Sequence, residues 1–357
     1  MSDEFDPDVL SESFAEMLGA EWPREKSVTW SQEPGLFAEP LWQQMSELGW
    51  AALTVPEDHG GLGLDLGCSA LLHSALGAAA APVPMLGSTL ATALLSAAGN
   101  DEQKACLLPQ IADGSLRCAV AQPCDMAANI DNGTISAVFR NMIDAPAANM
   151  LFLRATLNAA NCWVMISRDT EGVTVSEEAL TDATRTMGAV TLDNVTVDAA
   201  AIITAADANA LDDHLLRIAS VAIAADAIGG GEAVLAVTID YLKTREQFGR
   251  LIGSFQALKH RAADHQAALV AARGLVEHAA SLADDSPGAL LDALSAKQHV
   301  TRIVAEIARD CIQLHGGVGF TAEFPPHIYL KRAKLNEVLY GTRVDLLDHI
   351  ADMLEAA

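Results

Sequence analysis

Hydrophobic residues recur every three or four positions through the first third of the chain, as they do on one face of an α-helix. The pattern is clear in residues 10–18, 36–50 and 68–81. It is interrupted at residues 54–67, TVPEDHGGLGLDLG, where proline and glycine favour a turn that lets the backbone approach another group closely. We therefore predict an N-terminal helical domain over residues 1–117.

The pattern changes to alternation after residue 117. Short runs rich in β-branched residues alternate apolar and polar side chains, and turn signals such as Asp131-Asn132-Gly133 separate them. Alternation of this kind is typical of strands with one buried face. It predicts a small antiparallel β domain over residues 118–209.

Helical spacing returns in the last part of the chain. Residues 215–243, 254–282 and 288–315 each contain several turns of apolar period, and a four-helix bundle is the natural way to bury such helices. We predict a helical bundle over residues 210–357. The fold class is then α+β, in the order helical domain, β domain, bundle, and this order restricts the choice of folds more than any single motif.

Composition narrows the function further. The chain has 357 residues, 51% of them hydrophobic, which is enough for a sizeable core. Its net charge of -25 argues against nucleic acid or an anionic membrane surface as a partner. The first residues, MSDEFDPDVL, lack the order of a signal peptide, and the apolar stretches are shorter than the roughly 20 residues of a membrane span. We expect a cytoplasmic protein, and the cysteine spacing predicts no metal site.

Three stretches together resemble the acyl-CoA dehydrogenase family: residues 41–67, residues 241–265 with their RxxFG motif, and residues 307–342 with QLHGGVG and LYGT. The resemblance covers nearly the whole chain. It implies an acyl-CoA dehydrogenase-like fold, an FAD cofactor and α,β-dehydrogenation of an acyl-CoA thioester. In such enzymes a carboxylate removes the α-proton, the flavin accepts the β-hydride, and an electron-transfer flavoprotein takes the electrons.

In this family the adenine end of FAD extends into the neighbouring subunit. The resemblance implies that role here for Arg245, Phe248, Gln256, Gln313, Gly316 and Gly317. Arginine offers a fork of donors to pyrophosphate oxygens, and glycines let backbone N–H groups approach them. Taken alone, Arg245 also fits a surface ion pair with Glu246 or Asp240. We interpret His315, within the same motif, as a packed core histidine.

The positions that contact the flavin ring in the family differ here. Residues 121–126, AQPCDM, lack the usual glycine turn, and Met142 and Asp144 stand where an aromatic and a hydroxyl residue are usual. Thr342 keeps the Gly-Thr pair, for which the resemblance implies a flavin contact, while residues 343–345 diverge. We infer that this chain houses no flavin ring of its own; a diverged but working site is the alternative.

The catalytic base of the family is also missing. Tyr340 occupies the position of the usual glutamate, and with an ordinary pKa of about 10 it is a poor base near neutral pH. The other family position falls near Ala219. Asp226 and Glu337 are alternative bases, but Asp226 lies about 10 Å further along its helix, and Glu337 at i,i+3 suits a pair with Lys334.

These departures favour one half of a mixed pair. We predict that the chain joins a homologous catalytic subunit in an α2β2 assembly and shares its FAD, with a steroid side chain or another bulky acyl group as substrate. The partner would bring the carboxylate, the ring pocket and the acyl-CoA channel. The alternatives are a homotetrameric acyl-CoA dehydrogenase with a relocated carboxylate and a flavin-free scaffold protein.

Overall fold

The first part of the chain is helical, as its apolar spacing predicts. The computed structural model describes residues 6–123 and 126–356. Aspartate or asparagine side chains cap the first turns of α1, α4 and α6, which fixes where these helices begin. The elements are α1 (Pro7–Glu21), α2 (Arg24–Gln32), α3 (Glu39–Glu47), the short 3-10 helix η1 (Glu57–His59), α4 (Leu66–Ala79), α5 (Met85–Ala98) and α6 (Asp101–Ala112).

The middle part forms one sheet with the strand order β6-β7-β3-β2-β4-β5-β8, and β1 pairs with β4. Most neighbours are antiparallel, as predicted, but β1 and β2 both run parallel to β4. The strands are β1 (Cys118–Val120), β2 (Ala128–Asp131), β3 (Thr134–Ile143), β4 (Met150–Leu157), β5 (Ala160–Ser167), β6 (Val173–Glu178), β7 (Met187–Thr196) and β8 (Ile202–Ile203). The short 3-10 helix η2 (Ala199–Ala201) lies between β7 and β8.

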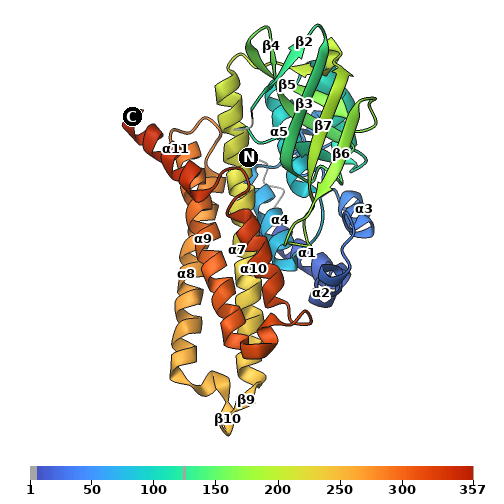
Figure 1. Ribbon diagram of the computed structural model, residues 1–357. Coiled ribbons are helices and arrows are strands. Elements are labelled where there is room, and N and C mark those ends of the chain that lie inside the picture. Colours follow the sequence, from blue (N-terminus) through green and yellow to red (C-terminus); the bar gives the residue numbers. More distant parts are fainter. Residues whose placement is uncertain (1–5, 124–125, 357) are drawn as a thin grey trace.

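The last part is a bundle of three long helices and a shorter fourth one that runs down one side of the molecule (Figure 1). Its members are α7 (Ala208–Thr244), α8 (Gln256–Ser281), α9 (Ala289–His315) and α10 (Pro326–Asn336), and α11 (Arg343–Ala356) extends from its upper end. A two-stranded hairpin of β9 (Glu246–Gln247) and β10 (Arg250–Leu251), with η3 (Ile252–Ser254), joins α7 to α8 at the lower end, where η4 (Gly316–Phe320) also lies. The α+β class predicted from the sequence is confirmed.

Helix α7 is the central element of the molecule. It is long and apolar enough to cross a membrane by composition alone, but 78% of its most apolar window is buried inside the protein. It packs on α4, α5, α8, α9 and α10. Such burial is typical of the core helix of a globular protein.

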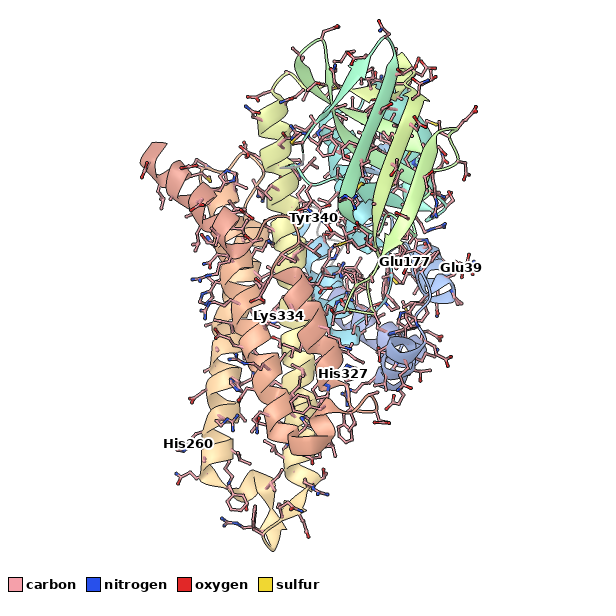
Figure 2. The ribbon with its side chains drawn as sticks, viewed as in Figure 1. Glu39, Glu177, His260, His327, Lys334 and Tyr340 are labelled. Atoms are coloured by element: carbon pink, nitrogen blue, oxygen red, sulfur yellow. The ribbon has the colours of Figure 1, made fainter. Side chains whose placement is uncertain are left out.

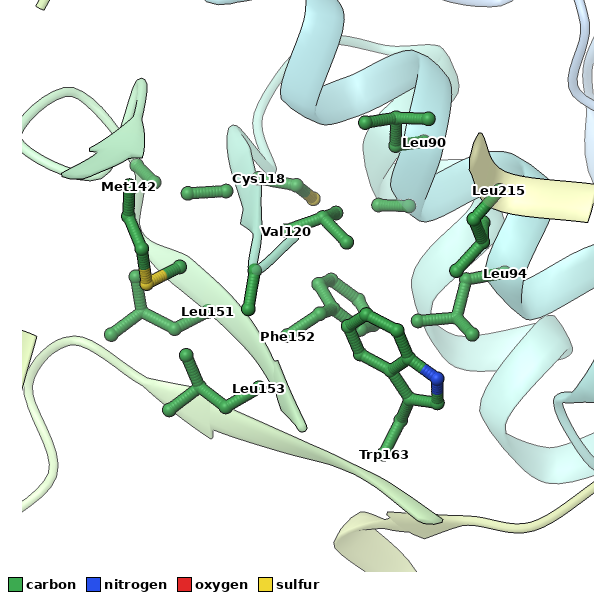
Figure 3. Close-up of a cluster of buried hydrophobic side chains, with 14 of the residues drawn as sticks. Leu90, Leu94, Cys118, Val120, Met142, Leu151, Phe152, Leu153, Trp163 and Leu215 are labelled. Carbon is green, nitrogen blue, oxygen red and sulfur yellow. The ribbon is translucent and has the colours of Figure 1, made fainter. Parts of the chain in front are cut away.

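The β domain is joined to the helices by a continuous hydrophobic core. Leu90 and Leu94 of α5 meet Phe152 of β4 and Trp163 of β5, and Leu215 of α7 closes the same cluster (Figure 3). The side of the sheet that faces α5 therefore carries the apolar set of its strands. This packing fixes where the residues between β1 and α7 lie.

Candidate functional site

Six of the predicted cofactor residues gather at the lower end of the bundle. Arg245 follows α7, Phe248 lies in the hairpin, and Gln256 begins α8. Gln313 is in the last turn of α9, with Gly316 and Gly317 directly after that helix. All six are exposed, and 56 residues lie between Gln256, the last of the first half, and Gln313, the first of the second half. The up-and-down course of the bundle brings them together, because α7 ends and α9 ends at the same level (Figure 1).

The hairpin presents Phe248 to solvent. Phe248 and Gly249 form a two-residue turn in which both backbones have positive φ, 53° and 75°, as a type I′ turn requires. A phenylalanine rarely adopts this conformation, and its side chain is 91% exposed. Its ring meets only the edge of Phe255, on whose face Arg250 lies at 3.9 Å from the ring centre. The turn therefore holds an aromatic ring outside the core.

The guanidinium group of Arg245 and the backbone of Gly316 and Gly317 are accessible at the same end of the bundle, although the Gly316 N–H already donates to the Gln313 carbonyl. Within the described residues no ion pair joins Arg245 to Glu246 or Asp240. A Cβ atom added to Gly316 or Gly317 would meet nothing within 4 Å, so their backbone faces open space. Arginine donors and accessible N–H groups are the donors that bind pyrophosphate oxygens.

Tyr340 lies elsewhere, beside the β domain and far along the bundle from His260 of α8 (Figure 2). It is only 1% exposed, and its hydroxyl donates to the carbonyl of Val120 in β1 at 2.9 Å. Its backbone has a φ of 54°, and the next carbonyl, of Gly341, accepts from the buried Lys297 Nζ at 2.7 Å. Tyr340 is therefore a core residue that joins the bundle to the sheet.

Met142, Asp144 and Ala121, also expected around the flavin ring, are in the interior. Met142 is buried in the same cluster as Tyr340. Ala121 is buried, and its N–H donates to the carbonyl of Phe152 at 2.9 Å. Cys124 and Asp125 lie outside the described residues. Thr342 is exposed and bonds Asp345 through its N–H and its hydroxyl, so its observed partners are those of a cap for α11.

Asp226, one of the two alternative bases, belongs to a buried network of charges. Its carboxylate accepts from Arg185 at 2.8 Å, from Arg332 at 2.6 Å and from the amide of Asn336 at 2.8 Å. Burial alone would raise the pKa of Asp226, but the two guanidinium groups outweigh it and hold the pKa well below its usual range. Such a carboxylate is ionised, and its affinity for a proton is low.

Glu337, the other alternative, pairs with Lys334 at 2.6 Å. The sequence predicts this pair from the i,i+3 spacing. Ala219, at the second family position of the base, is fully buried. None of these residues lines either of two cavities of the described chain, of about 590 and 880 Å³.

A cavity of about 590 Å³ lies between α5 and the first half of α7. Thr89, Thr92 and Ser96 of α5 form one wall, and His214 and Ile218 of α7 face them. Its acids are already engaged: Asp65 accepts from the N–H of Cys68 at 3.0 Å, and Asp284 pairs with Arg217. The cavity has room for an apolar group but presents no free carboxylate.

Comparison with known proteins identifies the family. The N-terminal domain of acyl-CoA dehydrogenase matches residues 8–115, and its C-terminal domain matches residues 213–354. Acyl-CoA dehydrogenase IpdE2 of Mycobacterium tuberculosis is 32% identical over 299 residues, which are 83% of this chain and 81% of that protein. The chain belongs to the acyl-CoA dehydrogenase family.

Two solved structures resemble it along their whole length. One is a chain of the ChsE4-ChsE5 complex from Mycobacterium tuberculosis, with a TM-score of 0.91, 25% identity and complete coverage of both chains. The other is a variant of the Tcur3481-Tcur3483 steroid ACAD, with a TM-score of 0.88, 26% identity and 98% coverage of each chain.

The acyl-CoA dehydrogenase family depends on FAD, and the residues of this chain fit only part of that cofactor. The free guanidinium, the exposed ring and the open glycine backbone at the lower end suit its pyrophosphate and adenine. Beside Tyr340, the positions that contact the flavin ring in the family hold the buried side chains of Met142 and Asp144. The two halves of the expected site thus differ in how much room they leave.

Sequence reasoning missed Arg185 and Arg332, the partners of Asp226. Arg332 shares a basic stretch with Lys331 and Lys334, which reads as an exposed helix face. Arg185 precedes β7 in a connection without periodicity. Only the acid gave a signal, since Asp226 is a single charge within the apolar run AIAADAIGGG, and a buried charge requires a partner.

Proposed function

We propose that this chain is the partner subunit of a mixed acyl-CoA dehydrogenase. It completes the FAD site of a homologous catalytic subunit in an α2β2 assembly and supplies no catalytic base. The observation that carries the proposal is the bond from the Tyr340 hydroxyl to the Val120 carbonyl. The position that holds the catalytic base in the family is occupied here by a buried tyrosine that joins the bundle to the sheet.

The chain's own contribution is then electrostatic and steric. The Arg245 guanidinium pairs with the pyrophosphate of the partner's FAD, the missing side chains of Gly316 and Gly317 let its oxygens approach the backbone, and the Gly317 N–H donates to them. Phe248 covers the adenine end, while Gln256 and Gln313 donate or accept at its edge. The bound flavin supplies hydride acceptance, and the partner supplies the carboxylate, the ring pocket and the acyl-CoA channel.

The relatives support a proposal for the substrate class of the assembly. A solved neighbour is described as a steroid ACAD, and we propose a steroid side chain or another bulky acyl-CoA thioester for the assembly. Electrons would leave to an electron-transfer flavoprotein. A cytoplasmic location suits a chain with a net charge of -25, whose long apolar helix is mostly buried.

One observation favours a second candidate, a homotetrameric acyl-CoA dehydrogenase with a relocated carboxylate. The cavity of about 590 Å³ between α5 and α7 would accept an acyl group. Against it, Asp226 is held by Arg185 and Arg332, and Glu337 by Lys334. A flavin-free scaffold is the third candidate.

The flavin content of the purified protein tests these candidates. The chain is expressed alone and together with its catalytic partner, and visible flavin absorbance is compared with protein concentration. We expect no flavin for the chain alone and about one flavin per two chains in the complex, because only the assembled site holds FAD. One flavin per chain in the protein expressed alone would contradict the proposal and favour the homotetramer. Absence of flavin from both preparations would favour the scaffold.

A further inference from the structure

A second cavity, of about 880 Å³, lies on the other side of residues 64–65 from the first. Its floor is made of buried small and branched side chains of α4, α7 and α8: Ala70, Ala225, Ile228, Val276 and Ala280. Its rim is exposed and comes from α1, η1 and α8. The size falls within the range of small-molecule sites, and an apolar floor with a few polar groups is their usual composition.

The cavity lies along the contact between two helices. Helices α4 and α7 touch backbone to backbone near Gly77 and Gly229. Toward the beginning of α4 the facing residues are Ala70 and Ala225, whose side chains are too short to fill the space between the helices. Gly63 and Gly67 continue the wall without side chains.

Charge decides what can enter. The rim carries Asp8, Glu57 and Glu277, all exposed. Arg273 is the one cationic side chain in the described lining, and it is already engaged: its Nε donates to Glu232 Oε1 at 2.7 Å, and its Nη2 pairs with the other oxygen of Glu232. The mouth of the cavity is therefore negative, with no free cation to receive an anion.

We propose that this cavity binds an apolar amine, with the hydrocarbon body on the floor and the ammonium group among the carboxylates of the rim. The same charges exclude phosphate esters and carboxylates, and therefore CoA thioesters, since like charges repel across a partly apolar mouth. The site is independent of the function proposed above. Nothing in it uses the residues at the lower end of the bundle or Tyr340.

Three probes of one chain length test the proposal by titration calorimetry on the purified full-length protein: decylammonium, decanol and decyl sulfate, each below the concentration at which it forms micelles. We expect decylammonium to bind most tightly, decanol more weakly and decyl sulfate not at all. Decyl sulfate binding as tightly as decylammonium would overturn the proposal.

Two matched substitutions place the binding. Ala70→Leu fills the floor of this cavity and should abolish decylammonium binding, whereas Ala93→Leu, in the wall of the first cavity, should leave it unchanged. The opposite result would assign the probe to the first cavity and overturn the proposal. Circular dichroism and a thermal midpoint for each variant show whether it folds.

Substitutions at the exposed rim decide the question even if Ala70→Leu fails to fold. Glu57→Gln and Glu277→Gln should each lower the preference for decylammonium over decanol by up to about fivefold, the scale of an ion pair near a surface. Glu306→Gln, on α9 beside Arg302, removes the same charge away from the cavity and should have no effect. An unchanged preference in both rim variants would contradict the proposed site.

Discussion

Three buried ionisable side chains meet where the helical domain, the sheet and the bundle join. His73 of α4 contacts the hydroxyl of Thr89 at 3.1 Å, and burial lowers the pKa of His73 to about 4. Asp144, after β3, accepts a long hydrogen bond from the Gly87 N–H, and burial raises its pKa to about 6, against the lowering effect of Arg185. Asp226 is held ionised by its arginines. Each group therefore has a different protonation range in the folded protein.

The Asp144→Asn variant should change how stability depends on pH. Between about pH 4 and 6, folded Asp144 keeps a proton that the unfolded chain has released, so its contribution to stability falls as pH rises. Over the same range the unfolded chain binds a proton at His73 that the folded protein does not, so that contribution rises with pH. The two slopes oppose each other, and removal of Asp144 should leave the rise due to His73.

Urea unfolding at the two ends of this range measures the effect. The rise in the pKa of Asp144 from 3.8 to about 6 corresponds to about 3 kcal/mol. From about pH 4 to pH 6, the free energy of unfolding of the variant should therefore increase by about this amount relative to that of the wild type. Asp169→Asn, at an exposed turn, is the control and should follow the wild type. A variant curve parallel to that of the wild type would show that Asp144 is ionised throughout.

Tyr340 offers a second test at single-residue scale. Tyr340→Phe keeps the ring but leaves the buried carbonyl of Val120 without its donor, which should lower the free energy of unfolding by about 1–3 kcal/mol. Tyr241→Phe is the control, because the Tyr241 hydroxyl has no hydrogen-bond partner among the described residues. Chemical denaturation of both variants gives the comparison, and equal stability of the two would mean that the bond to Val120 contributes nothing.

At the scale of elements, the contact between α4 and α7 depends on two glycines. A Cβ on Gly229 would lie 1.9 Å from the carbonyl oxygen of Ser74, and one on Gly77 would lie 1.9 Å from that of Asp226. Both obstacles are backbone atoms, which cannot rotate away. The helices can approach this closely only because neither position has a side chain.

The Gly229→Ala variant should therefore be strongly destabilised, by about 3 kcal/mol or more, because the two helices must separate. Gly274→Ala on α8 is the matched control: its Cβ would meet nothing within 4 Å, and alanine should stabilise that helix by up to about 1 kcal/mol. Thermal unfolding followed by circular dichroism separates the two outcomes. A Gly229→Ala protein as stable as Gly274→Ala would show that α4 and α7 can move apart at little cost.

The elements themselves were largely predictable, since period and alternation report burial on one face. The direction of β1 was not. Its apolar run is compatible with either strand direction, and only its pairing beside β4 makes it parallel. The start of α7 also differs from the pattern, because Asp207 caps the helix with its side chain at Ala208, several residues before the apolar period begins.

At the scale of the whole molecule, the sequence motifs predicted which residues belong to the candidate cofactor site but not how far apart they lie in the fold. Arg245 and Gln313 come together because antiparallel helices return the chain to the same level, and a bundle of three long helices allows that inference. The network of Asp226, Arg185 and Arg332 could not be predicted, because it joins the bundle to the β domain and no local pattern encodes the relative positions of the two. Nor could the two cavities, which depend on which small side chains face each other.

The assembly supplies the last prediction, which concerns Arg245. In a complex with the catalytic partner, Arg245→Ala should weaken FAD retention by roughly 30-fold, about 2 kcal/mol, because one charge-assisted contact to the pyrophosphate is lost. The fold should be unaffected, since Arg245 is exposed and its backbone bond to Tyr241 does not involve the side chain.

Arg302→Ala, which removes an equal charge from the side of α9, is the control. Flavin released on dilution, followed by its fluorescence, measures retention. If both variants keep flavin as the wild type does, the lower end of the bundle is not the part that holds the partner's cofactor. If both lose it equally, the loss reflects net charge and not a contact at Arg245.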